Sequence, residues 1–366
     1  MDQGSPMKRH GNLWPRIVAF ENLLLAFRKA RKGKRRRPDV ARFDLNLETE
    51  LLSLQLELMS QSYRPGAYRN FTIYERKPRQ ISAAPFRDRV VHHALLNVVE
   101  PLIDRRFIFD SYACRPGKGV HRAVRRYQQW SQRYAYALKL DVARYFPSID
   151  HAILKQQLRR HLKDARVLWL FDVILDHSPA FPDEPPVYFP GDDLLSPLTR
   201  RAGIPIGNLT SQYLANLYLN ELDHFVEERL RVKAYLRYVD DLVLLSDSKP
   251  ELHTWRAEVE EQLMDVRLRV HPRKANVFRV HDGVDVLGYR VFPGYRKLRD
   301  DNGHRFARRL RGFAAAYQRG EKDWEDINPS VQSWIGHARQ ADTEGLRRSL
   351  FASTVFKRER GCVCRV

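Results

Sequence analysis

The sequence is poor in cysteine and has no long hydrophobic run. Its three cysteines, Cys114, Cys362 and Cys364, are an odd and sparse set that excludes a disulfide framework and favours a reducing compartment. No further metal-binding residues surround Cys362 and Cys364, so they do not indicate a metal site. No apolar stretch approaches the roughly 20 residues that cross a bilayer, and the N-terminus has no apolar signal core. We therefore expect a soluble, cytoplasmic protein with no membrane partner.

Acidic residues are also in deficit. The chain has 64 Lys and Arg against 44 Asp and Glu, which gives a formal net charge of +20. Such an excess repels itself unless a polyanion is nearby, and nucleic acid is the usual polyanion. The excess is densest at residues 28–37, RKARKGKRRR. We interpret this segment as a polyanion-binding stretch, with a solvated tail as the alternative.

Apolar residues are present in patterns that predict both helices and strands. Leu45, Leu52, Leu56 and Met59 recur at near-helical spacing and predict an amphipathic helix over 44–59. Further elements are predicted as follows: a basic hairpin at 70–87, a strand at 134–141, a helix at 251–264, a strand pair in VDVLGYRVF and helices in the last ~60 residues. The sequence therefore predicts an α+β chain with a sizeable core.

Three aspartates are the strongest candidates for chemistry. Asp240 and Asp241 lie at the tip of a hairpin predicted from YLRYV and LVLLS, and Asp141 ends another apolar strand. Adjacent acids inside an apolar run are costly unless a cation compensates them. Mg²⁺ prefers carboxylate oxygens, and two such ions ~3.5–4 Å apart serve nucleotide joining. The pattern predicts a two-metal site, and a plain polar turn is the alternative for the Asp pair.

Two other Asp pairs lack this strand context. Asp192-Asp193 lies in a proline-rich insertion, and Asp300-Asp301 precedes Asn-Gly. We interpret both pairs as polar turns.

Ordered segments of the chain resemble the palm motifs of reverse transcriptases. LKLDVARYFPSIDH at 138–151 resembles the motif with the first catalytic Asp, and GIPIGNLTSQ at 203–212 resembles the nucleotide-pocket motif. RYVDD resembles the double-Asp motif. HPRKANVF and VDVLGYRVF resemble the lysine-bearing motif and the primer grip. RQISAAPFRDRVVHHAL and SYACRPGKGVH resemble finger motifs. The likeness extends over roughly residues 60–350.

The resemblance implies a catalytic set. Asp141, Asp240 and Asp241 would be catalytic and would hold two Mg²⁺ ions, with Mn²⁺ as the alternative metal. The backbone carbonyl of Val142 would be a further metal ligand. Lys274 would help pyrophosphate to leave.

The resemblance also implies a substrate-binding set. Phe146 occupies the steric-gate position, where a ring would exclude the 2′-OH of a ribonucleotide; core packing is its alternative role. Lys77 and Arg79 would clamp the triphosphate of the dNTP, with a solvated basic hairpin as the alternative. Ile206 and Gln212 would lie near the incoming nucleotide.

The fold implied is a right hand, with fingers, a palm with an antiparallel sheet, and a helical thumb. The expected division is a basic N-terminal arm at 1–40, fingers at 41–130, a palm at 131–295 with a finger insertion at about 151–200, and a basic helical thumb and tail at 296–366. The partners implied are an RNA template and a DNA primer or cDNA strand, gripped through phosphates in a salt-dependent way.

Residues 206–212, together with FPSIDH and SVQSWIGHARQADTEGLRR, resemble the enzymes of diversity-generating retroelements, which are bacterial or phage-encoded. These enzymes misincorporate opposite template adenines and use a small basic accessory protein. Group II intron enzymes usually have Pro-Gln-Gly where this chain has Pro205-Ile206-Gly207, and the Val-Thr-Gly of retron enzymes is not found. The alternatives are an antiviral-defence or retron-like reverse transcriptase, and a catalytically inactive RNA-binding scaffold.

Overall fold

The computed structural model describes residues 9–74, 78–179 and 187–358. Lys77, Cys362 and Cys364 therefore lie outside the described residues. The chain divides into two compact units. Unit 1 comprises Met1–Pro116, Leu140–Leu242 and Thr254–Ala275, and unit 2 comprises Gly117–Lys139, Val243–His253 and Asn276–Val366. No helix in the described ranges is both long and apolar enough to cross a membrane.

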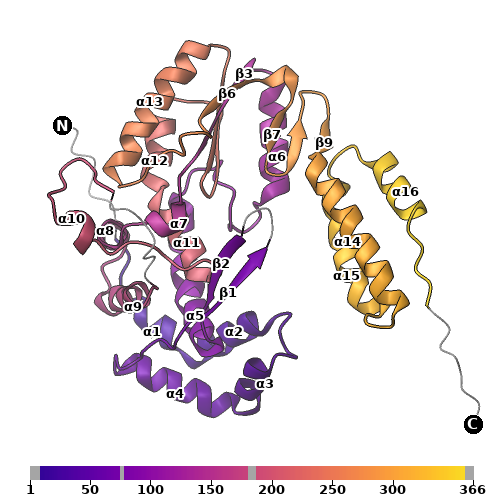
Figure 1. Ribbon diagram of the computed structural model, residues 1–366. Coiled ribbons are helices and arrows are strands. Elements are labelled where there is room, and N and C mark those ends of the chain that lie inside the picture. The colour runs from indigo at the N-terminus through magenta and orange to yellow at the C-terminus, as the bar shows by residue number, and fades with distance from the viewer. Residues whose placement is uncertain (1–8, 75–77, 180–186, 359–366) are drawn as a thin grey trace, which may run out of the picture. The chain divides into compact units, whose positions relative to one another are not determined.

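The first part of unit 1 is a group of helices around α5 (Phe86–Ile103) (Figure 1). The others are α1 (Trp14–Val18), α2 (Phe20–Arg31), α3 (Pro38–Leu45) and α4 (Leu47–Met59). Helix α2 packs along α5 and buries Leu23, Ala26 and Phe27. Part of the segment expected to be an N-terminal arm is thus a packed helix.

The helix predicted over 44–59 is largely present as α4, but the face assigned to the core is wrong. The buried residues of α4 are Leu51, Leu54 and Leu58. The exposed residues are those on which the prediction was based: Leu45, Leu52, Leu56 and Met59. Leucines occur on both faces of this helix, so their spacing alone could not identify the buried one.

The basic hairpin is confirmed. Strands β1 (Arg69–Tyr74) and β2 (Pro78–Ala83) pair antiparallel, with Arg69 opposite Ala83 and Ile73 opposite Arg79. Most of both strands is exposed, and only the end of β2, at Ser82 and Ala83, is buried. The base of the hairpin is therefore fixed in the protein while Arg79 faces solvent.

A four-stranded sheet carries the aspartates and has the order β4-β5-β3-β6. Its strands are β3 (Tyr136–Asp141), β4 (Tyr235–Tyr238), β5 (Asp241–Ser246) and β6 (Asn276–Arg279). The strand at 134–141 and the hairpin around Asp240 are thus confirmed. The other helices with residues in unit 1 are α7 (Tyr145–Ser148), α8 (His151–His161), α9 (Ala165–Asp176), α10 (Ser196–Thr199), α11 (Leu209–Tyr218), α12 (Asn220–His224) and α13 (Lys249–Asp265).

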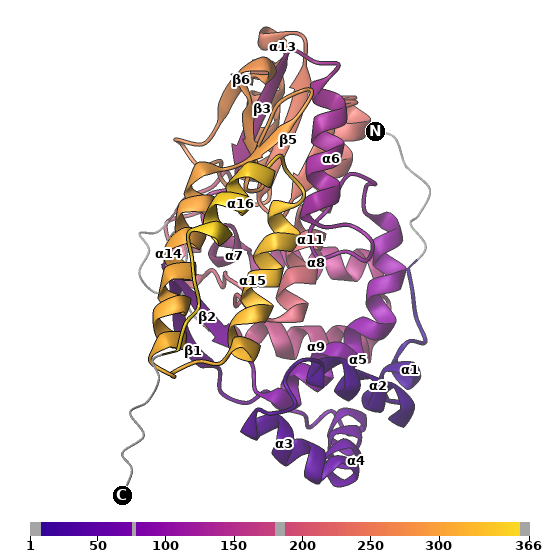
Figure 2. The same cartoon turned by 90° about the vertical axis from the view of Figure 1, so that its right-hand side faces the viewer.

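Unit 2 contains α6 (Val120–Ser131), a small antiparallel sheet and three C-terminal helices. The sheet has the order β7 (Val284–Val286), β8 (Tyr289–Val291) and β9 (Arg296–Leu298). The helices are α14 (Asp300–Gln318), α15 (Trp324–Ala338) and α16 (Glu344–Ala352), which lie together in both views (Figure 2). The turn predicted at Asp300-Asp301 is wrong, because both residues lie in the first turn of α14, where acids favour a helix start.

Candidate active site

The backbone brings Asp141 and Asp240 to adjoining strand ends. Asp141 is the last residue of β3, and the next amide, Val142 N, donates a 3.1 Å hydrogen bond to the carbonyl of Asp240. Asp240 lies between β4 and β5, and Asp241 begins β5. Val239 has a φ of 56°, a left-handed conformation that is rare for a β-branched residue and marks a tight, strained turn. The strained turn is what presents two successive carboxylates at the hairpin tip.

The electrostatics of this tip are unfavourable to negative charge. Burial, together with the charges of Asp241 and Asp141, raises the pKa of Asp240 to about 6. A carboxyl group with a raised pKa beside like charges is typical of a functional site. A nearby cation would relieve the repulsion.

Lys274 supplies one such cation. Its Nζ donates a 2.6 Å hydrogen bond to Oδ2 of Asp141. The turn that carries Lys274 is tied to the same aspartate, because His271 N donates to the Asp141 carbonyl at 2.7 Å and Lys274 N donates to the His271 carbonyl at 2.9 Å. The lysine is therefore positioned by the backbone of the residue that it neutralises.

The donor set fits a hard divalent ion. Carboxylates and a backbone carbonyl are the oxygen ligands that Mg²⁺ takes, and Asp141, Asp240, Asp241 and Val142 offer them on neighbouring segments. Within the described ranges, however, no group of three acidic, histidine or cysteine side chains stands ready-made as a metal cluster. The Asp141 carboxylate is directed to Lys274 instead. Metal binding at these residues thus entails exchanging the ammonium for the metal at Asp141 or sharing the carboxylate between them.

Arg237 supports the β4–β5 hairpin through buried hydrogen bonds. It is fully buried and pairs with the fully buried Asp223, through Nη2 to Oδ2 at 2.6 Å and Nε to Oδ1 at 2.7 Å. Its Nη1 also donates to the carbonyl of Val239 at 3.2 Å and to Oδ1 of Asn216 at 3.2 Å. Sequence reasoning missed this network. The signal was available, since a lone arginine inside the apolar run YLRYV must have a buried partner.

Phe146 lies in α7, five residues after Asp141, and is half-buried. Its carbonyl accepts a 3.0 Å hydrogen bond from Ile204 N, which joins the strand end to the segment at 203–212. Its ring packs edge-on against Tyr145 at 5.8 Å. Because Phe146 is only half-buried, it can still contact a ligand, as the steric-gate role requires.

The segment that contains Ile206 is joined to the β1–β2 hairpin. Ser82 N donates to the Ile206 carbonyl at 3.1 Å, and the Asn208 side chain bonds both Ala84 N and the Ser82 carbonyl at 3.1 Å. Gly207 has a φ of 113°, and a Cβ there would lie 2.8 Å from Ile81, so only glycine fits. Asn208, which was not identified from the sequence, thus fixes the base of the hairpin that carries Arg79. Gln212 is exposed on α11.

The Asp192-Asp193 pair has a structural role. Asp192 accepts hydrogen bonds from the Arg200 guanidinium and from Phe189 N, and lies 3.6 Å from Arg267. Asp193 accepts from the backbone amides of Leu195 and Ser196 at the start of α10. Oδ2 of Asp192 and Oδ1 of Asp193 are therefore held by hydrogen-bond donors of the protein itself.

A family comparison identifies the family of this chain. Residues 69–291 match the family described as "Reverse transcriptase (RNA-dependent DNA polymerase)". The chain belongs to this family. The match contains every candidate site residue, including the three aspartates. Membership agrees with the expected α+β right-hand fold and confirms, at the level of the family, an RNA-directed DNA polymerase. Enzymes of this family use divalent metal ions and bind an RNA template and a nucleic-acid primer.

Individual relatives include a group II intron-encoded protein. The chain is 27% identical over 287 residues to Protein YkfC of Escherichia coli (strain K12), covering 67% of this chain and 72% of YkfC. It is 24% identical over 182 residues to the group II intron-encoded protein LtrA of Lactococcus lactis subsp. cremoris, covering 49% of this chain but only 28% of LtrA. Among solved structures, telomerase from Candida albicans matches with a TM-score of 0.45 and 11% identity, over 80% of this chain and 56% of the telomerase chain.

Proposed function

We propose that this chain synthesises cDNA on an RNA template, with Asp141, Asp240, Asp241 and the Val142 carbonyl as ligands of two Mg²⁺ ions. The observation that carries the proposal is the adjoining position of Asp141 and Asp240, linked through Val142, in a chain of the reverse transcriptase family. When bound, such ions activate the attacking 3′-oxygen and stabilise the leaving pyrophosphate.

The protein residues would position the catalytic groups and discriminate between nucleotides. The Val239 turn holds Asp240 and Asp241 at the tip. Lys274, an exposed ammonium beside Asp141, would donate a proton or a hydrogen bond to the departing pyrophosphate. The Phe146 ring would exclude a 2′-OH, so that dNTPs are accepted and ribonucleotides rejected.

The remaining substrate contacts belong to the fingers and the pocket. Arg79, exposed on β2, and Lys77, outside the described residues, would clamp the triphosphate. Ile206 and Gln212 would face the incoming nucleotide. The Asn208 bridge ties the hairpin base to the Ile206 segment, so nucleotide clamping and base-pair checking would be mechanically connected.

The biological class that we propose is the diversity-generating retroelement, which implies a small basic accessory protein as partner. The residue that supports it is Ile206, which cannot form the hydrogen bond that a glutamine could form near the template or the nucleotide. Weaker discrimination there would favour errors at template adenines. The intron-encoded relatives make a group II intron enzyme the competing class.

Sequencing the cDNA copied from a defined RNA tests this class. We expect errors concentrated opposite adenine in the wild-type chain, and fewer of them in Ile206→Gln. An error rate equal at all four template bases would contradict the proposed class, and an absence of any extension from an oligo(dT) primer on poly(rA) would contradict the polymerase function itself. The flanking DNA offers a second test, since a near-repeat that differs only at adenines is expected beside the gene.

A further inference from the structure

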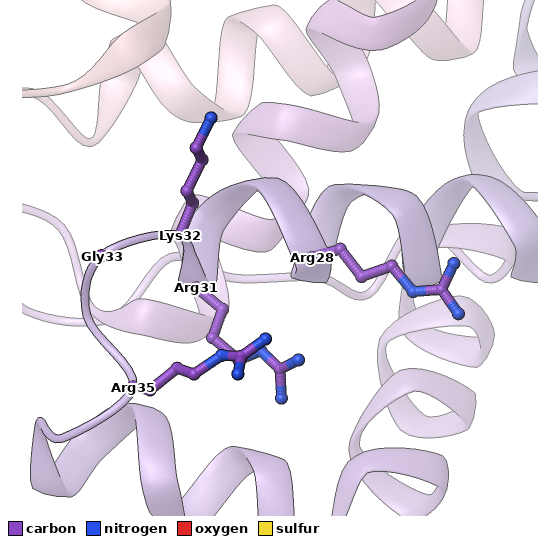
Figure 3. A pocket seen from close by; sticks show the side chains of 5 residues that line it. All are labelled: Arg28, Arg31, Lys32, Gly33 and Arg35. Atoms are coloured by element: carbon purple, nitrogen blue, oxygen red, sulfur yellow. The ribbon is translucent and has the colours of Figure 1, made fainter.

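A hollow at the C-terminal end of α2 in unit 1 is lined almost wholly by cationic side chains. Its lining residues are Arg28, Arg31, Lys32, Gly33 and Arg35 (Figure 3). Arg28 and Arg31 come from the last turns of α2, and the rest come from the turn that follows it. Gly33 has a φ of 72°, a left-handed conformation that lets the chain reverse there. In the view of Figure 3 the Arg31 and Arg35 side chains overlap, while Arg28 and Lys32 extend in other directions.

The hollow stands on a fixed base. Phe27 and Ala30 of α2 are almost completely buried, and the Phe27 ring stacks on Phe43 of α3 at 5.6 Å. The Arg31 guanidinium lies 4.9 Å from the centre of the same ring and donates to Asp44 Oδ2 at 2.6 Å. These contacts order the end of α2 before any ligand arrives. The basic block thus begins as a preformed surface and not as a loose tail.

The positive charge of this surface is poorly compensated. Arg28, Lys32 and Arg35 are exposed, and none of them forms an ion pair with a carboxylate in the described part of the chain. Burial and the charges of Arg89 and Arg37 lower the pKa of the neighbouring Lys34. The four cations that line the hollow carry the same charge and lie close together, so a multiply charged anion would relieve the repulsion among them.

We propose that this hollow, formed by Arg28, Arg31, Lys32 and Arg35, binds the phosphate backbone of RNA outside the stretch being copied. Guanidinium groups match phosphate oxygens in geometry as well as charge, and a preformed set of them binds without a large ordering cost. The inference rests on the proposed function for the choice of RNA as the polyanion. It adds a second point of attachment, separate from the aspartates, that would retain a structured template during copying.

The test is an RNA-binding titration of the full chain, without dNTPs and with divalent metals chelated. The variant is Arg28→Gln/Lys32→Gln/Arg35→Gln, which spares Arg31 because that residue supports the fold. The matched control is Arg166→Gln/Arg229→Gln/Lys233→Gln. It also removes two arginines and one lysine, but from exposed positions outside the hollow. The probes are an RNA hairpin with a single-stranded extension and a DNA of the same sequence, each at several salt concentrations.

We expect the hollow variant to bind the RNA at least about tenfold more weakly. The number of counterions released on binding, given by the salt dependence of the affinity, should fall by about two. The control variant should bind like the wild type. Equal losses in both variants would show a bulk charge effect and overturn the proposal, as would an unchanged affinity or a loss confined to DNA. Because no step of the titration requires catalysis, failure of the hollow and failure of the polymerase function remain distinguishable.

Discussion

Lys274 Nζ donates a 2.6 Å hydrogen bond to Asp141 Oδ2. The same aspartate accepts a hydrogen bond at its carbonyl from His271, three residues before the lysine. A carboxylate proposed to hold a metal is therefore already paired with a cation that the fold places there. The lysine and a divalent ion would compete for one carboxylate, or share it.

Replacing Lys274 separates these two effects. In Lys274→Met the competing ammonium is gone, so we expect half-maximal activity at a Mg²⁺ concentration severalfold lower. The maximal extension rate should fall by roughly 10²-fold or more, because the group that assists the leaving pyrophosphate is lost. Lys274→Arg keeps the charge and should retain the wild-type Mg²⁺ dependence. Titrating Mg²⁺ in single-turnover extension measures both quantities, and an unchanged Mg²⁺ requirement in Lys274→Met would refute the competition.

Arg237 should position the hairpin as well as stabilise it. Removing one partner of a buried ion pair costs about 3–5 kcal/mol, so Arg237→Ala should unfold far more easily. Arg237→Lys keeps the charge but cannot bond Asp223, Asn216 and the Val239 carbonyl together. We expect this variant to lose much more extension rate than stability.

Arg115→Lys is the matched control for Arg237→Lys. Arg115 is also mostly buried and pairs with Asp104, while donating to the Ile108 and Ser111 carbonyls and not to the hairpin tip. Denaturant unfolding and steady-state extension should be measured on both variants. Equal losses of rate at matched stability would show that Arg237 has no special connection to the tip.

Phe146 should govern the choice of sugar. In Phe146→Ala we expect ribonucleotide incorporation to rise by roughly 10- to 100-fold relative to dNTPs, because a ring no longer occupies the space of the 2′-OH. Phe146→Tyr, which keeps the ring, should remain selective. Extension with single ribonucleotides measures the ratio. A ratio that does not change in Phe146→Ala would restrict the residue to core packing.

The buried His92 of α5 should make stability depend on pH. Burial, with smaller contributions from His93 and Arg89, lowers its pKa to about 3. The unfolded chain therefore binds this proton more readily between the ordinary value near 6.5 and about 3, so stability falls as the pH drops through that window, by up to about 1.4 kcal/mol per pH unit. The free energy of unfolding, measured with denaturant, should fall more steeply with decreasing pH in the wild type than in His92→Gln. The exposed His281 provides the control substitution, and identical pH slopes in the wild type and His92→Gln would contradict the prediction.

The sequence predicted those elements whose local pattern of apolar and polar residues allows only one structure. The apolar runs on either side of Asp240 and Asp241 predicted the hairpin, because alternative pairings of such runs are few. The buried face of α4 could not be predicted, since both faces carry leucine and only its neighbours decide between them. The same holds for Asn208 and for the partners of Arg237: hydrogen bonds between segments that lie far apart in the sequence leave little local pattern.

The most direct test of the central claim is primer extension by Asp240→Asn, with thermal unfolding measured on the same preparation. The substitution keeps the shape and removes a negative charge from a site where burial and like charges raise the pKa of that residue. Stability should therefore be unchanged or increased, while extension on poly(rA) with oligo(dT) should fall to background. Asp300→Asn, from the exposed start of α14, should behave like the wild type. Extension by Asp240→Asn at the wild-type rate would contradict the assignment of the aspartates as the catalytic centre.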